Sequence, residues 1–221
     1  MLKLQSVTKH YQHRGKIIRA LQEATLEIPH GDFVAMVGPS GSGKSTLLLI
    51  LGGMLSPAQG QVLFDGQSLY DLAPADRAKL RKQKIGFVFQ TFNLMPYLTA
   101  LENVQVPLLL AGIGETEQQE KATSLLERLG LGDRLDHKPS ELSVGQQQRV
   151  ALARMLANDP AVILADEPTG NLDPETSQSI LDFFEAVNRE GKTIVMVTHD
   201  PGAARRAKRT LRLVNGQIQT N

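Results

Sequence analysis

The sequence predicts an α/β fold with a mostly parallel core sheet, an antiparallel β region at the N-terminus and an inserted α-helical region. Apolar runs of strand length recur at 33–37, 85–89, 161–165 and 192–198. Such nearly continuous apolar strands are typical of a parallel sheet that is buried on both faces. Residues 1 to about 32 alternate between apolar and polar side chains, which favours antiparallel strands. From about 91 to 158 this pattern gives way to helical periodicity.

Length and composition narrow the classes of protein. A chain of 221 residues can bury a sizeable core, and we expect one domain, with a β-rich, RecA-like core at 1–90 and 159–221 and the helical insertion at 91–158. The formal net charge of +1 gives no electrostatic reason to expect a nucleic-acid partner. The chain has no cysteine, which excludes disulfides and thiolate metal sites and fits the cytosol.

The sequence carries no signal for secretion or membrane insertion. Residues 1–5 contain no signal-peptide core. The longest apolar stretches, near 47–55 and 104–113, are about half as long as a bilayer-spanning helix. We therefore expect that this chain does not cross a membrane unaided.

Turns and caps separate the expected elements. Asp65-Gly66 and Asn215-Gly216 are typical hairpin turns, polar turns are expected at 13–16 and 29–32, and Gly130 fits a helix C-cap. The expected strands lie at 2–7, 24–28, 33–37, 60–66, 85–89, 161–165, 192–198, 211–214 and 217–219. Outside the insertion, the expected helices lie at 46–51, 74–84, 174–190 and 203–208. Inside it, three helices are expected. The apolar face of the first is Leu101, Val104, Leu108 and Leu109, and that of the second is Ala122, Leu125, Leu126 and Leu129. The third helix runs from Ser143 to Leu156.

A phosphate-binding loop pattern, G-x-x-x-x-G-K-[ST], follows the apolar run 33–37. A strand that turns through glycines into a helix directs backbone N–H groups at phosphate oxygens, and the helix dipole adds positive potential. We expect Lys44 to neutralise the β- and γ-phosphates and the Ser45 hydroxyl to hold Mg²⁺. The alternative, a chance match in a Gly/Ser turn, is disfavoured by the flanking strand and helix. The residues expected to bind the nucleotide here are Gly38, Pro39, Ser40, Gly41, Ser42, Gly43, Lys44, Ser45 and Thr46.

Three further apolar strands end in polar side chains, namely Gln90, the pair Asp166-Glu167, and His199. Because ligands of parallel sheets bind outside the carboxyl ends of the strands, we expect these residues to meet at one nucleotide in a P-loop NTPase fold. Asp166 is expected to hold Mg²⁺. Strand alternation should turn Glu167 the other way, where it can act as general base on the attacking water.

The remaining two strand ends have weaker predictions. Gln90 can contact both metal and water, and His199 can donate to the γ-phosphate. A single Gln or His at a strand end is more often structural, and adjacent carboxylates also occur in solvated loops. These assignments therefore depend on the residues meeting at one site.

Two other features have a structural and a functional interpretation. Tyr11, expected in the first loop, is a half-buried aromatic on sequence alone, and the alternative is a surface on which a purine stacks. The basic residues Arg205, Arg206, Lys208 and Arg209 favour a solvated face over a nucleic-acid patch.

The segment Ser143-Val144-Gly145-Gln146 opens the third helix of the insertion. Ser143 and Gln146 match a capping box, and Ser143 and Gly145 also present a hydroxyl and an open helix N-terminus to an anion. The segment resembles the signature motif of ABC-transporter ATPases, and the other motifs occur in that family's order over essentially the whole chain. In chain order, Tyr11 is similar to the adenine-stacking A-loop residue, 38–45 to Walker A, Gln90 to the Q-loop glutamine, 162–166 to Walker B with Glu167 as catalytic base, 171–173 to the D-loop, and His199 to the switch histidine.

The resemblance implies an ATPase that uses Mg²⁺ and works as a pair. Ser143, Gly145 and Gln146 suit a γ-phosphate but lie far in sequence from the phosphate loop. We therefore expect a head-to-tail dimer, in which the Ser143 helix of one copy closes over Lys44 of the other and two ATP molecules lie at the interface. Val144 departs from the family, which usually has glycine there, and this puts the affinity of the closed dimer in doubt.

A finer resemblance is to the LolD, MacB and FtsE group, through 85–90, 92–94, 98–104 and 166–173. It implies a peripheral protein at the cytoplasmic face of the inner membrane that powers a MacB-, LolC- or FtsX-like permease. Export, lipoprotein release and antibiotic efflux stay open, as does FtsE-like signalling without a cargo. Soluble ABC ATPases of DNA repair or translation are a weaker alternative. We expect the permease to dock on helices of 91–158, near the apolar loop 92–98, for which core packing is the alternative interpretation.

Overall fold

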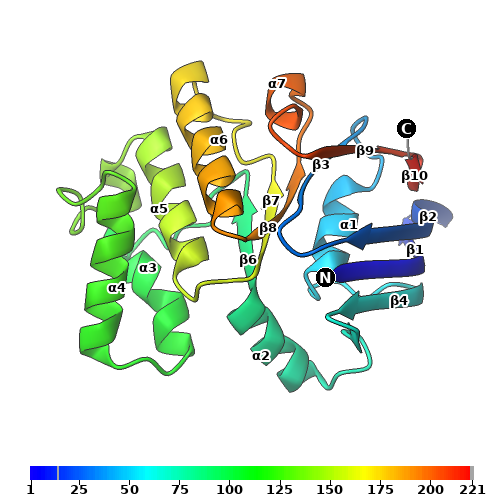
Figure 1. The fold of residues 1–221 in the computed structure, drawn as a ribbon, viewed down its shortest axis with the longest axis horizontal. Coiled ribbons are helices and arrows are strands. Elements are labelled where there is room, and N and C mark those ends of the chain that lie inside the picture. Colours follow the sequence, from blue (N-terminus) through cyan, green and yellow to red (C-terminus); the bar gives the residue numbers. More distant parts are fainter. Residues whose placement is uncertain (14, 220–221) are drawn as a thin grey trace.

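The computed structural model describes residues 1–13 and 15–219 and contains two sheets flanked by helices (Figure 1). The N-terminal sheet is antiparallel, in the order β2-β1-β4-β5. Its strands are β1 Leu2–His13, β2 Lys16–Ile28, β4 Gln59–Phe64 and β5 Gln67–Ser68.

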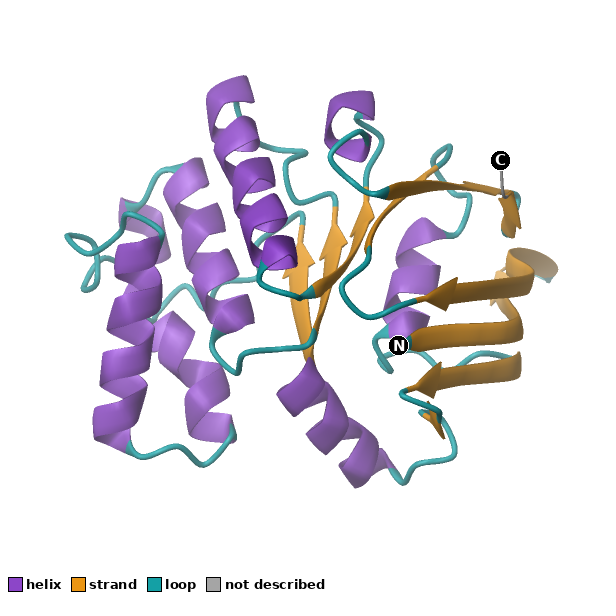
Figure 2. Cartoon of the chain, in the orientation of Figure 1, coloured by secondary structure: helices purple, strands orange, loops and turns teal. Residues whose placement is uncertain are grey.

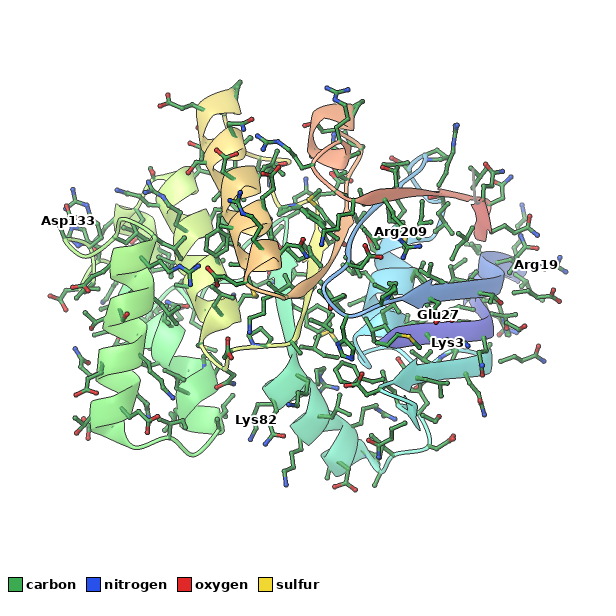
Figure 3. All side chains as sticks on the ribbon, in the orientation of Figure 1. Lys3, Arg19, Glu27, Lys82, Asp133 and Arg209 are labelled. Carbon is green, nitrogen blue, oxygen red and sulfur yellow. The ribbon has the colours of Figure 1, made fainter. Side chains whose placement is uncertain are left out.

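β1 is longer than the sequence predicts. It passes through Tyr11, which was expected in a loop, because β1 stays paired with β2 as far as His13 and Lys16. Shifts in register after Leu4, Val7 and Lys9 let the strand bend and continue. The turn expected at 13–16 includes residue 14, which lies outside the described residues. Figure 3 shows Lys3 and Glu27 on neighbouring strands of this sheet, where they form an ion pair at 3.4 Å.

The core sheet has the order β10-β9-β3-β8-β7-β6, and all neighbours are parallel except β10 with β9 (Figure 2). This confirms the mostly parallel core that the apolar runs predict. Its strands are β3 Phe33–Val37, β6 Ile85–Phe89, β7 Val162–Asp166, β8 Thr193–Val197, β9 Arg209–Val214 and β10 Gln217–Gln219.

Both faces of the core sheet are buried, as parallel sheets require. Ile163 and Ala165 of β7 face one hydrophobic cluster, which includes the helices of the insertion. Val162 and Leu164 face a second cluster, formed with the first helix and the N-terminal sheet. Alternate residues of one strand therefore join two cores, and the strand ends between them are free to carry a site.

Among the described residues, four helices lie outside the insertion: α1 Lys44–Leu51, α2 Pro74–Lys84, α6 Pro174–Arg189 and α7 Pro201–Ala204. The position expected for α7, 203–208, is wrong. Asp200 accepts hydrogen bonds from the N–H groups of Gly202 and Ala203 at 2.7 and 3.2 Å and so caps the helix, and Pro201 fits its first position. These two residues start the helix earlier than apolar spacing suggested.

The helices between residues 91 and 158 are α3 Ala100–Leu110, α4 Glu115–Arg128, the short 3₁₀ helix Pro139–Glu141 and α5 Val144–Leu156. Gly130 follows α4 with a φ of +70°, and the N–H groups of Gly130 and Leu131 bond back to its last turn, as the C-cap prediction requires. Leu101, Val104 and Leu108 are buried as expected, but Leu109 is 63% exposed. The first helix of the insertion thus has a narrower apolar face than the sequence suggested.

Tight turns close both predicted hairpins. Asp65 and Gly66 have φ values of +48° and +82°, and Asn215 and Gly216 have +49° and +76°. Left-handed values at both central residues define the hairpin turn that Asp-Gly and Asn-Gly favour. Within the described residues, no helix has the length and apolar character needed to span a bilayer.

Candidate nucleotide-binding site

The predicted phosphate loop connects β3 to α1 and depends on glycine for its shape. Gly43 has a φ of +104°, and a Cβ atom there would lie 2.1 Å from the carbonyl oxygen of Ala20 on β2. Only glycine can therefore stand directly before α1, which begins at Lys44. The loop therefore packs closely against β2, and the first residues of α1 line a pocket.

Lys44 places its ammonium group at this loop. Its side chain is only 8% exposed, and Nζ donates to the carbonyl oxygens of Gly38 and Pro39 at 2.8 and 2.9 Å. Ser42 is also buried, and in the described chain its Oγ has no hydrogen-bond partner. A cation held by loop carbonyls can turn to a phosphate group without a change in the backbone.

Asp166 ends β7 directly beside β6, where it pairs with Phe89. Burial raises the pKa of its carboxyl group above the ordinary value, and the nearby carboxylate of Glu167 adds to the rise. A hydrogen bond from the Ser45 side chain and the positive charge of Lys44 act in the opposite direction. The start of α1 and the end of β7 thus bring together Ser45 and Asp166, which are far apart in sequence.

These two side chains fit a magnesium ion. Within the described residues no group of three or more His, Cys, Asp or Glu side chains could hold a metal by itself. Mg²⁺ commonly takes one or two protein oxygens and completes its shell with water and substrate phosphates. A hydroxyl and a carboxyl group in contact beside a phosphate loop are such a donor set.

Glu167 and His199 meet at the ends of β7 and β8. Nδ1 of His199 lies 2.7 Å from Oε2 of Glu167, and the Glu167 N–H donates to the Val197 carbonyl at 2.9 Å. Glu167 lies beyond the end of the strand and has a φ of +47°. The prediction that strand alternation sets its direction is therefore wrong, because a left-handed turn sets it instead.

Gln90 contacts a residue of the segment that follows Glu167. Its Nε2 lies 3.5 Å from Oδ1 of Asn171, and Nδ2 of Asn171 donates to the Gln90 carbonyl at 3.2 Å. Asp173, two residues later, caps α6 by accepting from the Thr176 N–H at 2.9 Å. Hydrogen bonds from Thr176 lower the pKa of Asp173. Asp173 therefore has a structural role within its own chain.

A pocket of about 380 Å³ joins several of the predicted residues. Tyr11 reaches it from β1, and its hydroxyl lies 3.4 Å from Oγ1 of Thr46, while Nζ of Lys9 lies 5.6 Å from the centre of the ring. Glu167 also lines a neighbouring pocket of about 560 Å³ together with His199. The 380 Å³ pocket is lined by Tyr11, Ile18, Ala20, Ser40, Gly41, Gly43, Lys44, Ser45, Thr46 and Glu167.

Sequence reasoning missed Ile18 and Ala20 in this pocket. Ile18 lies directly opposite Tyr11 in the β1–β2 pair and is 52% exposed. An apolar residue exposed next to an aromatic one would have been the signal, but it becomes visible only once the register of the hairpin is known.

Ser143, Gly145 and Gln146 do not line this pocket. They begin α5, and Figure 1 shows α5 and α1 on opposite sides of β6, β7 and β8. Ser143 and Gln146 form the predicted capping box, with backbone-to-side-chain distances of 3.2 and 2.9 Å. Ser143 is exposed, and Gly145 packs against α6, where an added Cβ would lie 2.9 Å from Cγ2 of Thr176. One chain thus holds a nucleotide pocket and, elsewhere, an outward-facing helix N-terminus.

Known proteins match this combination of fold and loop. The family described as ABC transporter matches residues 21–170, which is more than half of the chain. The uncharacterized ABC transporter ATP-binding protein YbbA of Escherichia coli is 54% identical over 209 residues, which cover 94% of this chain and 90% of that protein. The macrolide export ATP-binding/permease protein MacB of Syntrophobacter fumaroxidans is 50% identical over 222 residues, 99% of this chain. The chain spans only 31% of that MacB.

Solved structures match over the full length. A dimeric structure of MJ0796, described as a bacterial ABC transporter cassette, has a TM-score of 0.94 and 46% identity and covers all of this chain and 97% of that one. A second dimeric structure of MJ0796, in a post-hydrolysis state with ADP and Pi, has a TM-score of 0.93 and 45% identity, with the same coverage. A protein of that name from Methanocaldococcus jannaschii is 47% identical to this chain over 224 residues. The chain belongs to the ABC transporter family, as an ATP-binding subunit whose reaction is the hydrolysis of ATP.

Proposed function

We propose that two copies of this chain enclose two ATP molecules between them and that hydrolysis drives a membrane permease. One observation carries the dimer: the pocket at Lys44 lacks Ser143, whose helix N-terminus is exposed elsewhere on the molecule. An exposed helix N-terminus attracts anions. Head-to-tail pairing about a twofold axis brings the Ser143 helix of each copy to the nucleotide of the other copy. The dimeric MJ0796 structures support this arrangement.

The residue roles follow from the contacts within the pocket. Lys44 and the backbone N–H groups of the loop 38–46, in which Pro39 has none, bind the phosphates, and Tyr11 with Ile18 forms the surface for the base. Mg²⁺, when bound through Ser45, Asp166 and Gln90, supplies charge neutralisation of the phosphate oxygens. Glu167 takes the proton of the attacking water, and His199 holds Glu167 in place and donates to the γ-phosphate. Gly145 and Gln146 keep the Ser143 helix start open towards the partner's nucleotide.

Mass in solution tests the dimer. Glu167→Gln keeps the shape of the side chain and removes the base, so this variant should form a stable dimer with Mg·ATP and stay monomeric with ADP or without nucleotide. Glu120→Gln, an exposed position on α4, should behave as wild type. A Glu167→Gln protein that stays monomeric at high concentration with ATP contradicts the proposal, as does an ATPase rate that is first order in protein and unaffected by Ser143→Arg.

Hydrolysis by this site has its own test. Lys44→Ala removes the only buried ammonium at the loop and should lower the ATPase rate by at least about 100-fold. Wild-type hydrolysis by Lys44→Ala would show that the loop assignment is wrong, whatever the oligomeric state.

A cleft of about 820 Å³ between α2, α3 and α5 is the proposed docking site for the permease. Leu110 and Met54 line it and are 66% and 50% exposed. Lys79 and Lys82 give one wall positive charge, and Figure 3 shows Lys82 on α2, from where its Nζ donates to the Leu110 carbonyl at 2.6 Å. The occupant we propose is a short amphipathic helix of the permease with apolar and acidic side chains.

The loop 92–98 lies at the start of the insertion, and its apolar side chains differ in burial. Leu94 packs against the hydrophobic cluster shared by the insertion and the core sheet, which agrees with the core-packing interpretation. Met95 and Tyr97 are 43% and 86% exposed and suit the docking interpretation.

The relatives named ATP-binding/permease protein are about three times as long as the matched segment, which supports a permease partner on the same chain or another. We place the protein at the cytoplasmic face of the membrane, where ATP is available.

Co-purification with the permease tests the docking site. Leu110→Glu and Tyr97→Glu should each abolish co-purification and stimulation of the ATPase, while basal hydrolysis is retained. Leu109→Glu is the matched control, because Leu109 is 63% exposed on the same helix but does not line the cleft. Intact stimulation of the Leu110→Glu and Tyr97→Glu variants would place docking elsewhere.

The proposal also includes a class of cargo for the permease. The MacB relatives are named for macrolide export, which favours export over signalling without a cargo for this chain. Loss of the gene should then lower macrolide resistance in its host. Unchanged resistance would favour lipoprotein release or the FtsE-like alternative.

A further inference from the structure

Helix α5 donates side-chain hydrogen bonds to main-chain carbonyls in several separate loops. Gln148, Arg149 and Arg154 bond to the carbonyls of Pro168, of Leu129, and of Phe92 with Asn93, respectively. Two of these loops belong to the proposed ATP site, since Pro168 follows Glu167 and Phe92 lies two residues after Gln90. The same helix begins at Ser143.

Arg154 holds the turn after Gln90. Phe92 and Asn93 are consecutive non-glycine residues with φ values of +56° and +50°, a conformation that costs on the order of 1–3 kcal/mol per residue. Nη2 of Arg154 donates to the Phe92 carbonyl at 2.6 Å, and Nη1 donates to the Asn93 carbonyl at 2.7 Å. Such a turn persists only when its surroundings hold it, and the planar fork of a guanidinium fits two adjacent carbonyls.

Arg154 also lines the cleft of about 820 Å³, but among the described residues its hydrogen bonds all go to the turn after Gln90. Its side chain is half-buried, and burial lowers the pKa of its guanidinium group. In the described part of the chain no carboxylate pairs with it, so the two carbonyl groups alone compensate for the lost hydration. Partial burial of a guanidinium is unfavourable unless its N–H groups are paired, and both pairs go to the strained turn after Gln90.

Gln148 holds the loop after Glu167 in a similar way. Its side chain is fully buried, and Nε2 donates to the Pro168 carbonyl at 2.6 Å. Oε1 of Gln148 has no partner among the described residues, which costs on the order of 1–3 kcal/mol. A methionine would fill the same space without this cost, but it would leave the Pro168 carbonyl without a donor.

We propose that Arg154 and Gln148 are positioning residues through which α5 couples the two ATP sites of the dimer, an inference that rests on the proposed dimer. Ser143 contacts the nucleotide of the partner copy, and the rigid helix reaches Arg154 about 16 Å away. A shift of α5 on closure therefore moves the backbone on which Gln90 and Glu167 of its own site depend. Hydrolysis at one ATP then requires that the other ATP is bound.

Steady-state kinetics of the full chain tests this coupling. Arg154→Lys keeps the charge but loses the fork, and Gln148→Met keeps the volume but loses the donor. Each should lower kcat about tenfold and bring the Hill coefficient for ATP towards 1. The dissociation constant for ATP, measured by adding ATP to nucleotide-free protein, should stay within about twofold of wild type. A role in stability alone would lower the melting temperature and leave the Hill coefficient unchanged.

Arg149→Lys is the matched control. It makes the same substitution on the same helix, but its lost bond, to the Leu129 carbonyl at 3.2 Å, lies at the end of α4 and away from the ATP site. The control should keep the kcat and cooperativity of wild type, and equal losses in the control would overturn the proposal. Cooperative hydrolysis that persists in both Arg154→Lys and Gln148→Met overturns the coupling alone. A wild type that is hyperbolic in ATP and first order in protein overturns the dimer and the coupling with it.

Discussion

Asp166 lies where function and stability oppose each other. Its carboxyl group is desolvated at the end of β7, and burial raises its pKa, which means that the folded protein favours the neutral form. A raised pKa contributes stability below the unfolded pKa and loses it as pH rises through the folded pKa. At neutral pH the ionised Asp166 therefore destabilises the nucleotide-free protein, although the same charge suits a metal ion.

Replacing Asp166 by Asn should raise the melting temperature of the nucleotide-free protein at pH 7. The amide keeps an acceptor for the Ser45 hydroxyl and removes the buried charge, and each ~1 kcal/mol shifts the melting temperature of a chain this long by roughly 2–4 °C. The gain should shrink as pH falls through the pKa of folded Asp166, and Mg·ATP should no longer stabilise the variant. Calorimetry at several pH values measures this, with the exposed Asp71→Asn as control. A variant less stable than wild type at pH 7 contradicts the argument.

The residues at the strand ends could be named from sequence because each follows an apolar run. Lys44, Asp166 and Glu167 follow or end such runs, and a parallel sheet collects its carboxyl ends on one edge. Their exact contacts could not be predicted. The direction of Glu167 depends on a left-handed turn and on His199, a pairing between two strands that no local pattern encodes. Arg154 was missed because its contacts are with carbonyl groups, which every residue has.

At the scale of elements, α1 is fixed at its C-terminal end by a residue from a distant loop. The hydroxyl of Tyr70 lies 2.7 Å from the Ile50 carbonyl and 2.6 Å from the Leu55 carbonyl, and its proton can go to either. Burial raises the pKa of Tyr70, so the hydroxyl stays protonated and remains a donor. The helix that carries the phosphate loop is therefore anchored at both ends.

Tyr70→Phe should lower the stability of the protein by about 1–2 kcal/mol, because it leaves the Leu55 carbonyl without its donor, while the Ile50 carbonyl keeps the bond from the Gly53 N–H. The expected fall in melting temperature is roughly 2–8 °C. Tyr97→Phe, at a residue that is 86% exposed, should cause no change. Equal melting temperatures for the two variants would show that the Tyr70 hydroxyl contributes nothing to the helix end.

Elements with strong local signals were predicted with bounds within a few residues, as α2 with Pro74 and the hairpin at Asn215-Gly216 show. Elements set by tertiary contact were not. β1 extends past Tyr11 because β2 offers a partner, and Leu109 is exposed because α3 packs on one side only. In both cases a neighbouring element determines the outcome, namely the length of β1 and the exposure of Leu109, and the local sequence does not show which element will be the neighbour.

At the scale of the molecule, the insertion and the core share one hydrophobic cluster. Val104 of α3, Leu126 of α4 and Val150 of α5 lie in the same cluster as Ile163 and Ile194 of the core sheet. An exposed ion pair between Arg128 and Glu190 adds a second link between α4 and the end of α6, although such pairs contribute little. The shared cluster supports the single domain that length and composition suggest.

A shared cluster requires that the molecule unfolds as one unit. Val150→Ala truncates a fully buried side chain on α5 and should destabilise the whole protein by roughly 1–3 kcal/mol. Calorimetry of the nucleotide-free protein should show one transition that moves to lower temperature in Val150→Ala, while Leu109→Ala, at an exposed position on α3, leaves it in place. Circular dichroism at the same temperatures should follow the same curve. If the transition of the variant instead splits, with the helices melting first and the sheet later, then the insertion is an independent unit. In that case a movement of α5 on dimer closure could not shift the backbone near Gln90 and Glu167.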